Sequence, residues 1–273
     1  MAMLTLTFDL EDNRSSPAQE VRFARMTERF MAFLDDIGAR GTFFVVGELS
    51  ALCAGLIRDI AEAGHEIALH GLRHVALGEV GPGRLREELQ RGRTAIEDIS
   101  GMPVSGFRAP IFSLTPATAW AIQEIQAAGF EYSSSVLPGA SPLHGWPGAP
   151  RKPFHWPGGL LELPCPLVGR GRYAIPFLGG VYLRYLPPRV VATGVRRLEE
   201  EICAWSYLHP YDLDASEPFF VLPHAGWLTS RIVHARRGST LDRLRSAVEA
   251  GGGAGPPLGH IASTLSLTPC FGP

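Results

Sequence analysis

The sequence predicts an α/β protein built around a parallel sheet or barrel, and three observations support this prediction. Short apolar segments typical of buried strands alternate with longer segments of helical periodicity through the first half of the chain. The chain has 273 residues and is 45% hydrophobic, which is enough for one sizeable core. Polar residues directly follow several of the strand-like segments. We expect one domain over residues 1–273, because α/β barrels of this length commonly form a single domain.

The periodicity of apolar residues places the expected strands and helices along the chain. The first helix carries apolar side chains at helical spacing and ends near Gly38, a residue typical of helix ends. The expected strands are residues 4–8, 41–46, 66–69, 106–108 and 205–208, and the expected helices are residues 17–38, 49–63, 84–100, 116–128, 190–204 and 241–250.

Two segments depart from this alternation. Residues 137–188 are rich in proline, glycine and aromatic residues and show few helical signals. They form either a long surface excursion or an insertion of loops that line a substrate groove, since binding residues favour loops on a rigid scaffold. The segment after residue 251 contains runs of glycine and proline, so we expect a mobile tail there.

Bulk properties exclude several classes of function and suggest a location. The formal net charge is −2, so no overall basic field recruits nucleic acid. The apolar run at the N-terminus stops at Asp9, which is too short for a signal peptide or a membrane span. We expect a cytoplasmic protein, with a place at the inner membrane surface left open. Scattered cysteines without C-x-x-C spacing indicate reduced thiols rather than a zinc-thiolate site: Cys53, Cys165, Cys203 and Cys270.

Two histidines follow the strand expected at residues 66–69. His70 and His74 are four residues apart, and on a helical turn this spacing places two imidazoles on one face, about 5–6 Å apart. The same spacing also arises by chance. A nearby carboxylate would complete a two-histidine, one-carboxylate metal site with positions open for water.

An acidic cluster at the end of the first strand offers that carboxylate. Asp9, Glu11 and Asp12 bring three negative charges together, which is unfavourable unless a cation or an arginine offsets them. A helix-capping turn at Asp12 or Asn13 is the alternative, but capping accounts for only one of the three acids. The cluster therefore offers both a metal ligand and a general base for water.

Two further strand ends carry candidate catalytic residues. Arg108 precedes Pro110, and its guanidinium could orient a carboxylate through paired hydrogen bonds. His209 follows the strand expected at residues 205–208, where a histidine near a metal could donate a proton to a leaving amine. Most arginines and single histidines have structural roles, so the order of the motifs matters more than either residue alone.

This ordered set of motifs resembles the polysaccharide deacetylase superfamily, also called the NodB-homology or carbohydrate esterase 4 superfamily. The resemblance spans roughly residues 4–213. Within the superfamily, the chain is most similar to the branch associated with exopolysaccharide export loci. The motifs are Thr7-Phe8-Asp9, Gly41-Thr42-Phe43-Phe44, residues 64–70 with His74, Phe107-Arg108-Ala109-Pro110 and Leu208-His209-Pro210.

The resemblance implies a catalytic domain with a distorted (β/α) barrel, expected to have seven strands, and a divalent metal. The metal is expected to be Zn²⁺, with Co²⁺, Ni²⁺ or Fe²⁺ as alternatives. Carried over to this chain, Asp9 resembles the catalytic base and Arg108 the residue that positions it. His70 and His74 resemble metal ligands and His209 the general acid, while the backbone N–H of Ile111 is placed to stabilise an oxyanion.

The chain departs from the family pattern at two places. Leu10 occupies the position of the second, metal-binding aspartate, so Glu11 or Asp12 has to supply the carboxylate ligand, and the spacing slightly favours Glu11. Relatives of this branch usually have an aspartate where this chain has Ser133. If that aspartate tunes the general acid, its replacement alters the pKa of His209.

The expected reaction is hydrolysis of an N-acyl group, most often N-acetyl, from an amino sugar or a glycoconjugate that carries one. Alternatives are hydrolysis of a non-sugar amide such as a formamide or cyclic ureide, and an inactive carbohydrate-binding relative. Three aromatic residues of the proline-rich segment are candidates for stacking on sugar faces, although loop aromatics are as often packing residues: Trp146, Trp156 and Tyr173.

Overall fold

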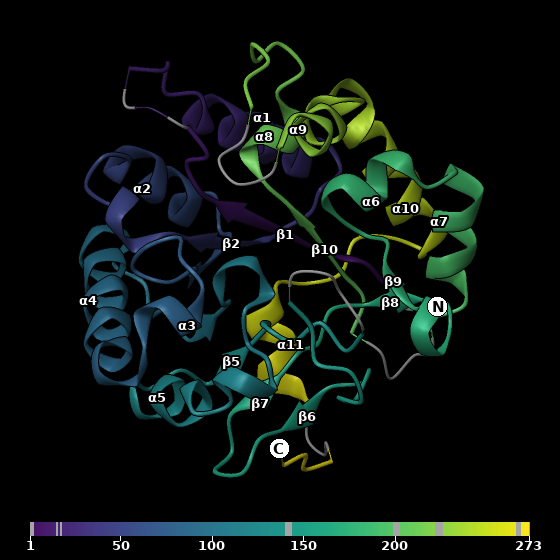
Figure 1. Cartoon of the computed structure of the whole chain (residues 1–273). Coiled ribbons are helices and arrows are strands. Elements are labelled where there is room, and N and C mark those ends of the chain that lie inside the picture. Colours follow the sequence, from purple (N-terminus) through teal and green to yellow (C-terminus); the bar gives the residue numbers. More distant parts are fainter. Residues whose placement is uncertain are drawn as a thin grey trace.

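The computed structural model describes residues 3–14, 16, 18–139, 144–198, 203–221, 226–265 and 269–272. A curled sheet forms its centre, and helices surround the sheet on the outside (Figure 1). The strands of this sheet lie in the order β10-β1-β2-β3-β4-β5-β7-β6. Their bounds are β1 (Thr5–Leu10), β2 (Thr42–Val45), β3 (Glu66–Leu69), β4 (Gly106–Phe107), β5 (Tyr132–Ser133), β6 (Phe154–His155), β7 (Leu161–Glu162) and β10 (Trp205–Leu208).

All neighbouring strands of the sheet pair in parallel except β6, which joins β7 in the antiparallel sense at one edge. A parallel part of seven strands is therefore extended by an eighth, and the predicted distorted α/β barrel is confirmed. A small second sheet pairs β8 (Leu167–Val168) with β9 (Ile175–Pro176).

Helices follow most strands and cover the outer face of the sheet. None of the helices in the described part of the chain has the length and hydrophobicity needed to cross a bilayer. The helices are α1 (Phe23–Asp36), α2 (Ala54–Glu62), α3 (Leu77–Val80), α4 (Pro82–Ser100), α5 (Ala121–Ala127), α6 (Gly180–Tyr185), α7 (Pro188–Arg196), α8 (Pro210–Leu213), α9 (Gly226–His234), α10 (Thr240–Ala250) and α11 (Leu258–Thr264).

Alternation along the strands separates two cores. Leu6 and Phe8 of β1 belong to the cluster shared with the outer helices, where the Phe8 ring stacks on Phe30 of α1 at 4.6 Å. Phe44 and Trp205 belong to the cluster inside the barrel. Successive side chains of a strand point to opposite faces, so a polar residue two positions beyond an inward one also points inward.

The described part of residues 137–188 is not only a surface excursion. It supplies β6 and β7 to the main sheet and β8 and β9 to the small one. Trp146 and Trp156 are 4% and 1% exposed, and their ring centroids lie 5.0 Å apart in an aromatic cluster. Strands β6 and β7 are only two residues long, which is too short to give a periodic pattern in a segment rich in proline and glycine. The sequence therefore did not predict them.

The described part of the C-terminal segment is anchored to the barrel. Leu258 of α11 is fully buried, and its backbone N–H donates to the Thr42 hydroxyl at 2.9 Å. The next amide, that of Gly259, donates to Glu66 Oε2 at 2.9 Å. Helix α11 therefore contributes to the inner core, in contrast to the mobile tail expected after residue 251.

Several helix boundaries differ from the sequence prediction. The helix expected over residues 49–63 begins at Ala54, after a separate 3₁₀ turn. The helix expected over residues 190–204 ends at Arg196, and residues 199–202 lie outside the described chain. Strand β10 begins and ends at the predicted residues, and all four of its residues are buried.

Candidate active site

Strand periodicity gathers the candidate residues at one end of the barrel. Asp9 lies two residues beyond Thr7 on β1, and Glu11 lies two further on, so both share the inward face. His70 lies two residues beyond the inward Ala68, and His209 two beyond the inward Tyr207. Because parallel strands end at the same edge, the side chains meet in one pocket.

Glu11, His70 and His74 form a cluster whose potential ligand atoms all lie within 4.8 Å of one another. Glu11 Oε2 lies 2.5 Å from His74 Nε2 and 3.9 Å from His70 Nε2. The two histidine rings have centroids 5.2 Å apart, close to the predicted spacing, although a bend rather than a helical turn brings them together. The two histidines are therefore neighbours in the structure.

Two members of this cluster, Glu11 and His70, have protonation states that suit a divalent metal, whereas the charge of Glu11 raises the pKa of His74 despite its burial. Burial alone raises the pKa of Glu11, but the charges of His74, His209 and His70 outweigh it and lower that pKa to about 2. Burial lowers the pKa of His70 to about 4, against the opposing charge of Asp9. A carboxylate and a neutral imidazole are the forms that bind metals.

A buried acceptor and an oriented imidazole add to this fit. Despite its closeness to His74, Glu11 Oε2 makes no hydrogen bond of good geometry within the described chain, as expected for an atom aimed at a cation. His70 Nδ1 lies 2.9 Å from the Arg108 carbonyl oxygen, which leaves Nε2 directed at the cluster. The residues present therefore fit a divalent ion.

Asp12 lies apart from this cluster. Its carboxylate accepts hydrogen bonds from the Arg14 side chain, including one of 2.7 Å from Nη2. The backbone N–H of Arg14 also donates to Asp12 Oδ1 at 3.1 Å, so Asp12 closes a local turn. Of the two carboxylates considered from the sequence, the structure brings Glu11 to the histidines and Asp12 to an arginine.

Arg108 holds Asp9 at the centre of the pocket. Its Nη1 donates to Asp9 Oδ1 at 2.6 Å and to the Thr7 hydroxyl at 2.7 Å. The guanidinium is 1% exposed and lies between the Phe44 ring, 3.9 Å from its centroid, and the Trp205 ring, at 4.3 Å. A buried ion pair fixed by hydrogen bonds and aromatic faces leaves Asp9 Oδ2 as the free oxygen of the carboxylate.

His209 faces the same oxygen from the opposite side and is held by Asp212. Its Nε2 lies 3.7 Å from Asp9 Oδ2, and its Nδ1 lies 2.8 Å from Asp212 Oδ2. Burial alone lowers the pKa of His209, but the charge of Glu11 and the hydrogen bond and charge of Asp212 raise it to about 9. His209 is therefore protonated at neutral pH, as a general acid must be.

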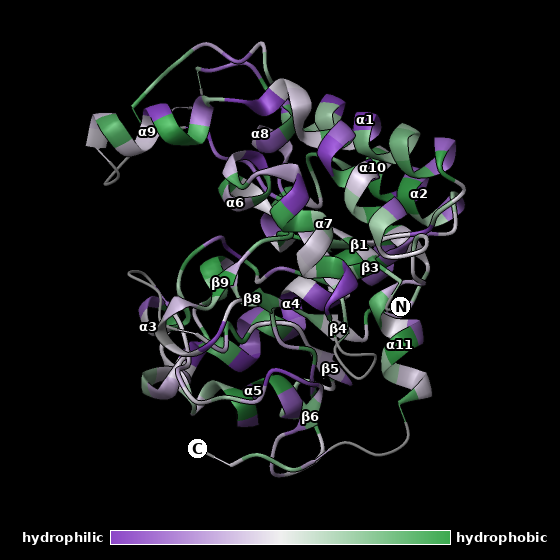
Figure 2. Cartoon of the chain, turned by 90° about the vertical axis from the view of Figure 1, so that its right-hand side faces the viewer, coloured by the Kyte–Doolittle hydropathy of each residue, from purple (hydrophilic) through white to green (hydrophobic). Residues whose placement is uncertain are grey.

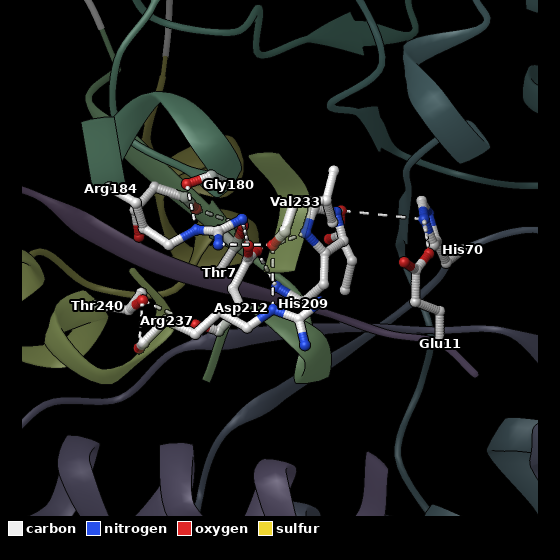
Figure 3. A network of polar contacts seen from close by, with 12 residues as sticks. Thr7, Glu11, His70, Gly180, Arg184, His209, Asp212, Val233, Arg237 and Thr240 are labelled. Carbon is white, nitrogen blue, oxygen red and sulfur yellow. Dashed lines mark hydrogen bonds and ion pairs between the residues drawn. The ribbon is translucent and has the colours of Figure 1, made fainter. Parts of the chain in front are cut away.

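Asp212 was missed in the sequence, and so was its own partner. Arg184 on α6 is fully buried, and its Nη2 lies 2.9 Å from Asp212 Oδ1 (Figure 3). The Ser133 hydroxyl donates to the Ser135 hydroxyl at 2.8 Å. The signal for Asp212 was its spacing: an acid three residues after His209 closes a capping box at the start of α8.

Ile111 lies at the rim of the pocket in a strained conformation. Its φ is 50° and that of Phe112 is 53°, values that non-glycine residues rarely adopt. The Ile111 side chain is 47% exposed, and the residue lines the pocket beside Arg108 and Ala109. Such strain is concentrated at functional sites, where the surrounding structure holds it in place.

The pocket has a volume of about 320 Å³ and combines the charged residues with an apolar wall. This wall does not include the aromatic residues proposed from the sequence. Trp146 and Trp156 are buried in the packing cluster beside β6, and Tyr173 is 71% exposed outside the pocket. The wall is formed by Ile111, Phe112, Leu137, Pro176, Val181, Tyr182, Tyr207 and Tyr211, with His144 among the polar lining residues.

An α/β barrel with two histidines, a glutamate and a buried aspartate–arginine pair at its strand ends is the architecture of a hydrolase with a candidate metal centre. Comparison with known families agrees with this class. Residues 2–133 match the polysaccharide deacetylase family, and residues 134–250 match a domain of unknown function designated DUF3473. Residues 2–133 are therefore similar to the polysaccharide deacetylase family, which agrees with assignment of the chain as a hydrolase.

Individual relatives are distant. A peptidoglycan deacetylase-like protein from Gibberella zeae is 29% identical over 110 residues, which are 40% of this chain and 32% of that protein. The chain thus spans about a third of the length of this curated relative.

Two solved structures share the fold. A protein from Mycobacterium smegmatis, assigned as a polysaccharide deacetylase, is 23% identical with a TM-score of 0.62, over 97% of this chain and 91% of that one. A family 4 acetyl xylan esterase from Clostridium thermocellum, in complex with a cobalt ion, is 16% identical with a TM-score of 0.52, over 95% and 90%.

Proposed function

We propose that the protein hydrolyses an N-acyl group, most often N-acetyl, on an amino sugar or a glycoconjugate that contains one. One observation supports this proposal above the others. A fixed carboxylate, a protonated histidine and a candidate metal cluster meet within one pocket, with Asp9 Oδ2 3.7 Å from His209 Nε2 and 3.9 Å from His70 Nε2. The match of residues 2–133 to the polysaccharide deacetylase family supports an acylated sugar as the substrate class.

Glu11, His70 and His74 would hold the metal, and the donor set suits Zn²⁺ or Co²⁺. A divalent ion bound there would lower the pKa of a water molecule and polarise the acyl oxygen. Cobalt is present in the structure of the acetyl xylan esterase, which has the same fold.

The protein residues provide the proton transfers. Asp9 Oδ2 accepts the proton of the attacking water, while Arg108 holds the other carboxylate oxygen and prevents rotation. The Ile111 N–H would donate to the oxygen that becomes negatively charged, a role that the left-handed backbone at this residue supports; such a donor contributes about 3 kcal/mol. His209 then protonates the leaving nitrogen, and acetate or formate and a free amine are released.

The pocket wall supports a sugar as the substrate. Tyr182 is 38% exposed beside the charged residues, so one ring face is available to the apolar face of a hexosamine. The Asp9-Leu10-Glu11-Asp12 opening and the Leu208-His209-Pro210 motif support placement in the branch associated with exopolysaccharide loci.

The first test combines metal analysis with product detection. Metal-stripped protein is reconstituted with Zn²⁺ or Co²⁺ and assayed for acetate and formate release on a panel of N-acylated sugars. We expect release by the wild type, a loss of at least about 100-fold in Asp9→Asn, and loss of bound metal in His70→Ala. Asp12→Asn is the matched control, because Asp12 pairs with Arg14 outside the cluster.

Each other outcome of this test has a definite meaning. Failure of the reconstituted wild type to bind metal would contradict the proposed mechanism. Bound metal without turnover of any sugar would point to a non-sugar amide or to a binding role. Loss of metal in Asp12→Asn with retention in Glu11→Gln would reverse the ligand assignment.

A further inference from the structure

Helix α9 presents an exposed apolar surface that the proposed reaction does not use. Figure 2 shows α9 projecting from the body of the molecule, on the side that also carries α6 and β9. We define the α9 patch as the large apolar side chains of this helix and of the segment before it, with the basic residues among them. Its members and exposed fractions are Phe219 39%, Val221 50%, Trp227 59%, Leu228 68% and Ile232 39%, together with exposed Arg231 and Arg236.

The charged side chains of the α9 patch are all basic. Residues 218–241 contain no aspartate or glutamate. The nearest preceding acid is Glu217, whose Oε2 forms an ion pair with Arg237 Nη1 at 2.6 Å. Neither Arg231 nor Arg236 forms an ion pair with a carboxylate of the described residues, and both lie over aromatic rings: Arg231 is 4.8 Å from the Phe219 centroid, and Arg236 is 4.8 Å from that of Tyr185.

Hydrogen bonds from helix α6 hold the C-terminal end of the α9 patch beside the pocket. Arg184 of α6 donates to the carbonyl oxygens of Val233 and Ala235 at 2.8 and 2.7 Å, and the Tyr185 hydroxyl donates to that of Ile232 at 3.2 Å. Helix α6 also lines the pocket through Tyr182. The C-terminal half of α9 is therefore fixed to the pocket wall, whereas its first turn, with Trp227 and Leu228, extends into solvent.

We propose that the α9 patch docks the protein on an anionic membrane surface, with the mouth of the pocket beside the bilayer. Exposed tryptophan, leucine and phenylalanine suit the boundary between headgroups and acyl chains, and unpaired arginines are attracted by anionic headgroups. A second copy of the chain is a poorer occupant, because a symmetric dimer would bring together two patches that both carry positive charge. Docking would bring the pocket next to a substrate that is carried on a lipid. This consequence rests on the proposed function, whereas the docking itself does not.

The test is vesicle binding by the full-length protein. It is mixed with vesicles of phosphatidylcholine alone or of phosphatidylcholine with phosphatidylglycerol, and cosedimentation is measured together with Trp fluorescence. We expect binding to the anionic vesicles, weakened by added salt, with a blue shift from Trp227. Trp227→Ser combined with Leu228→Ser should reduce binding by about 10-fold or more, and Arg231→Gln should reduce mainly the salt-sensitive part.

Leu52→Ser is the matched control, since Leu52 is also 59% exposed but lies outside the patch. Binding that is equal for neutral and anionic vesicles, or that is unchanged in the Trp227→Ser, Leu228→Ser protein, would overturn the proposal. Dimers that dissociate in that double variant would overturn it in favour of a second copy. The double variant should keep wild-type activity on a soluble N-acyl sugar, so failure of docking and failure of the proposed function are distinguished.

Discussion

At the scale of single residues, the central feature is the protonated imidazole of His209. Asp212 binds one ring nitrogen at 2.8 Å, while Arg184 lies 2.9 Å from the other carboxylate oxygen. The acid–base pair is thus supported on both sides, since Arg108 holds Asp9 in the same way. Two buried arginines each fix one carboxylate, so the base and the residue that holds the acid keep their positions, with Asp9 Oδ2 3.7 Å from His209 Nε2.

Replacement of Asp212 tests this arrangement through the pH profile. In the wild type His209 has a pKa of about 9. The proton it donates is present below that pKa, so kcat/KM should fall as the pH rises through the alkaline limb. Asp212→Asn removes the negative charge that stabilises protonated His209. Burial then lowers the pKa of His209, so the alkaline limb should move to lower pH by about 1–2 units. A bound metal ion shifts the alkaline limb of the wild type and that of Asp212→Asn in the same direction. The quantity to measure is therefore the difference in pH between the two alkaline limbs.

The profile of Asp12→Asn should remain that of the wild type, because Asp12 contacts Arg14 and not His209. Thermal melts show whether Asp212→Asn is folded at the assay temperature. A uniform loss of rate with an unmoved alkaline limb would mean that Asp212 has a packing role only.

At the scale of elements, the sequence predicted the strands with long apolar runs and the short strand β4, but missed the other two-residue strands. Strand β10 and the order of the site motifs could be predicted because each depends on local pattern alone. The contacts of Trp156 and of Arg184 depend on which segments meet across the barrel, and no local spacing carries that information. The strands β6 and β7 are held by tertiary pairing rather than by propensity, which is why a loop was the natural expectation there.

Helix α11 offers a test of an element that the sequence placed in a loose tail. Leu258 is fully buried among inner residues of the barrel. Truncation to alanine should lower the free energy of unfolding by about 2–4 kcal/mol, measured by urea denaturation, because it leaves a cavity. Leu52→Ala, at a side chain that is 59% exposed, should change it by less than about 0.5 kcal/mol. Equal effects of the two substitutions would show that α11 is not part of the cooperative core.

At the scale of the whole molecule, the site depends on the curvature of the sheet. The residue pairs that meet there are far apart in the sequence: Thr7 and Ser206 lie on adjacent strands, and their hydrogen bond spans 199 positions. Local unfolding of the β10 edge of the sheet would therefore separate the base from the acid. Global stability and the integrity of the site should change together.

Metal binding provides the corresponding measurement. Glu11 follows β1 while His70 and His74 follow β3, so only the folded barrel presents all three ligands. An ion that binds the folded state alone stabilises it by about 2.7 kcal/mol at a concentration of 100 times Kd. For a chain of this size that corresponds to a rise in Tm of roughly 5–10 °C on adding Zn²⁺. Glu11→Gln should reduce most of this rise, because an amide oxygen is a weaker ligand than a carboxylate, while Asp12→Asn should keep it. A full rise in the Glu11→Gln protein would exclude Glu11 as a ligand, and loss of the rise in Asp12→Asn would transfer that role to Asp12.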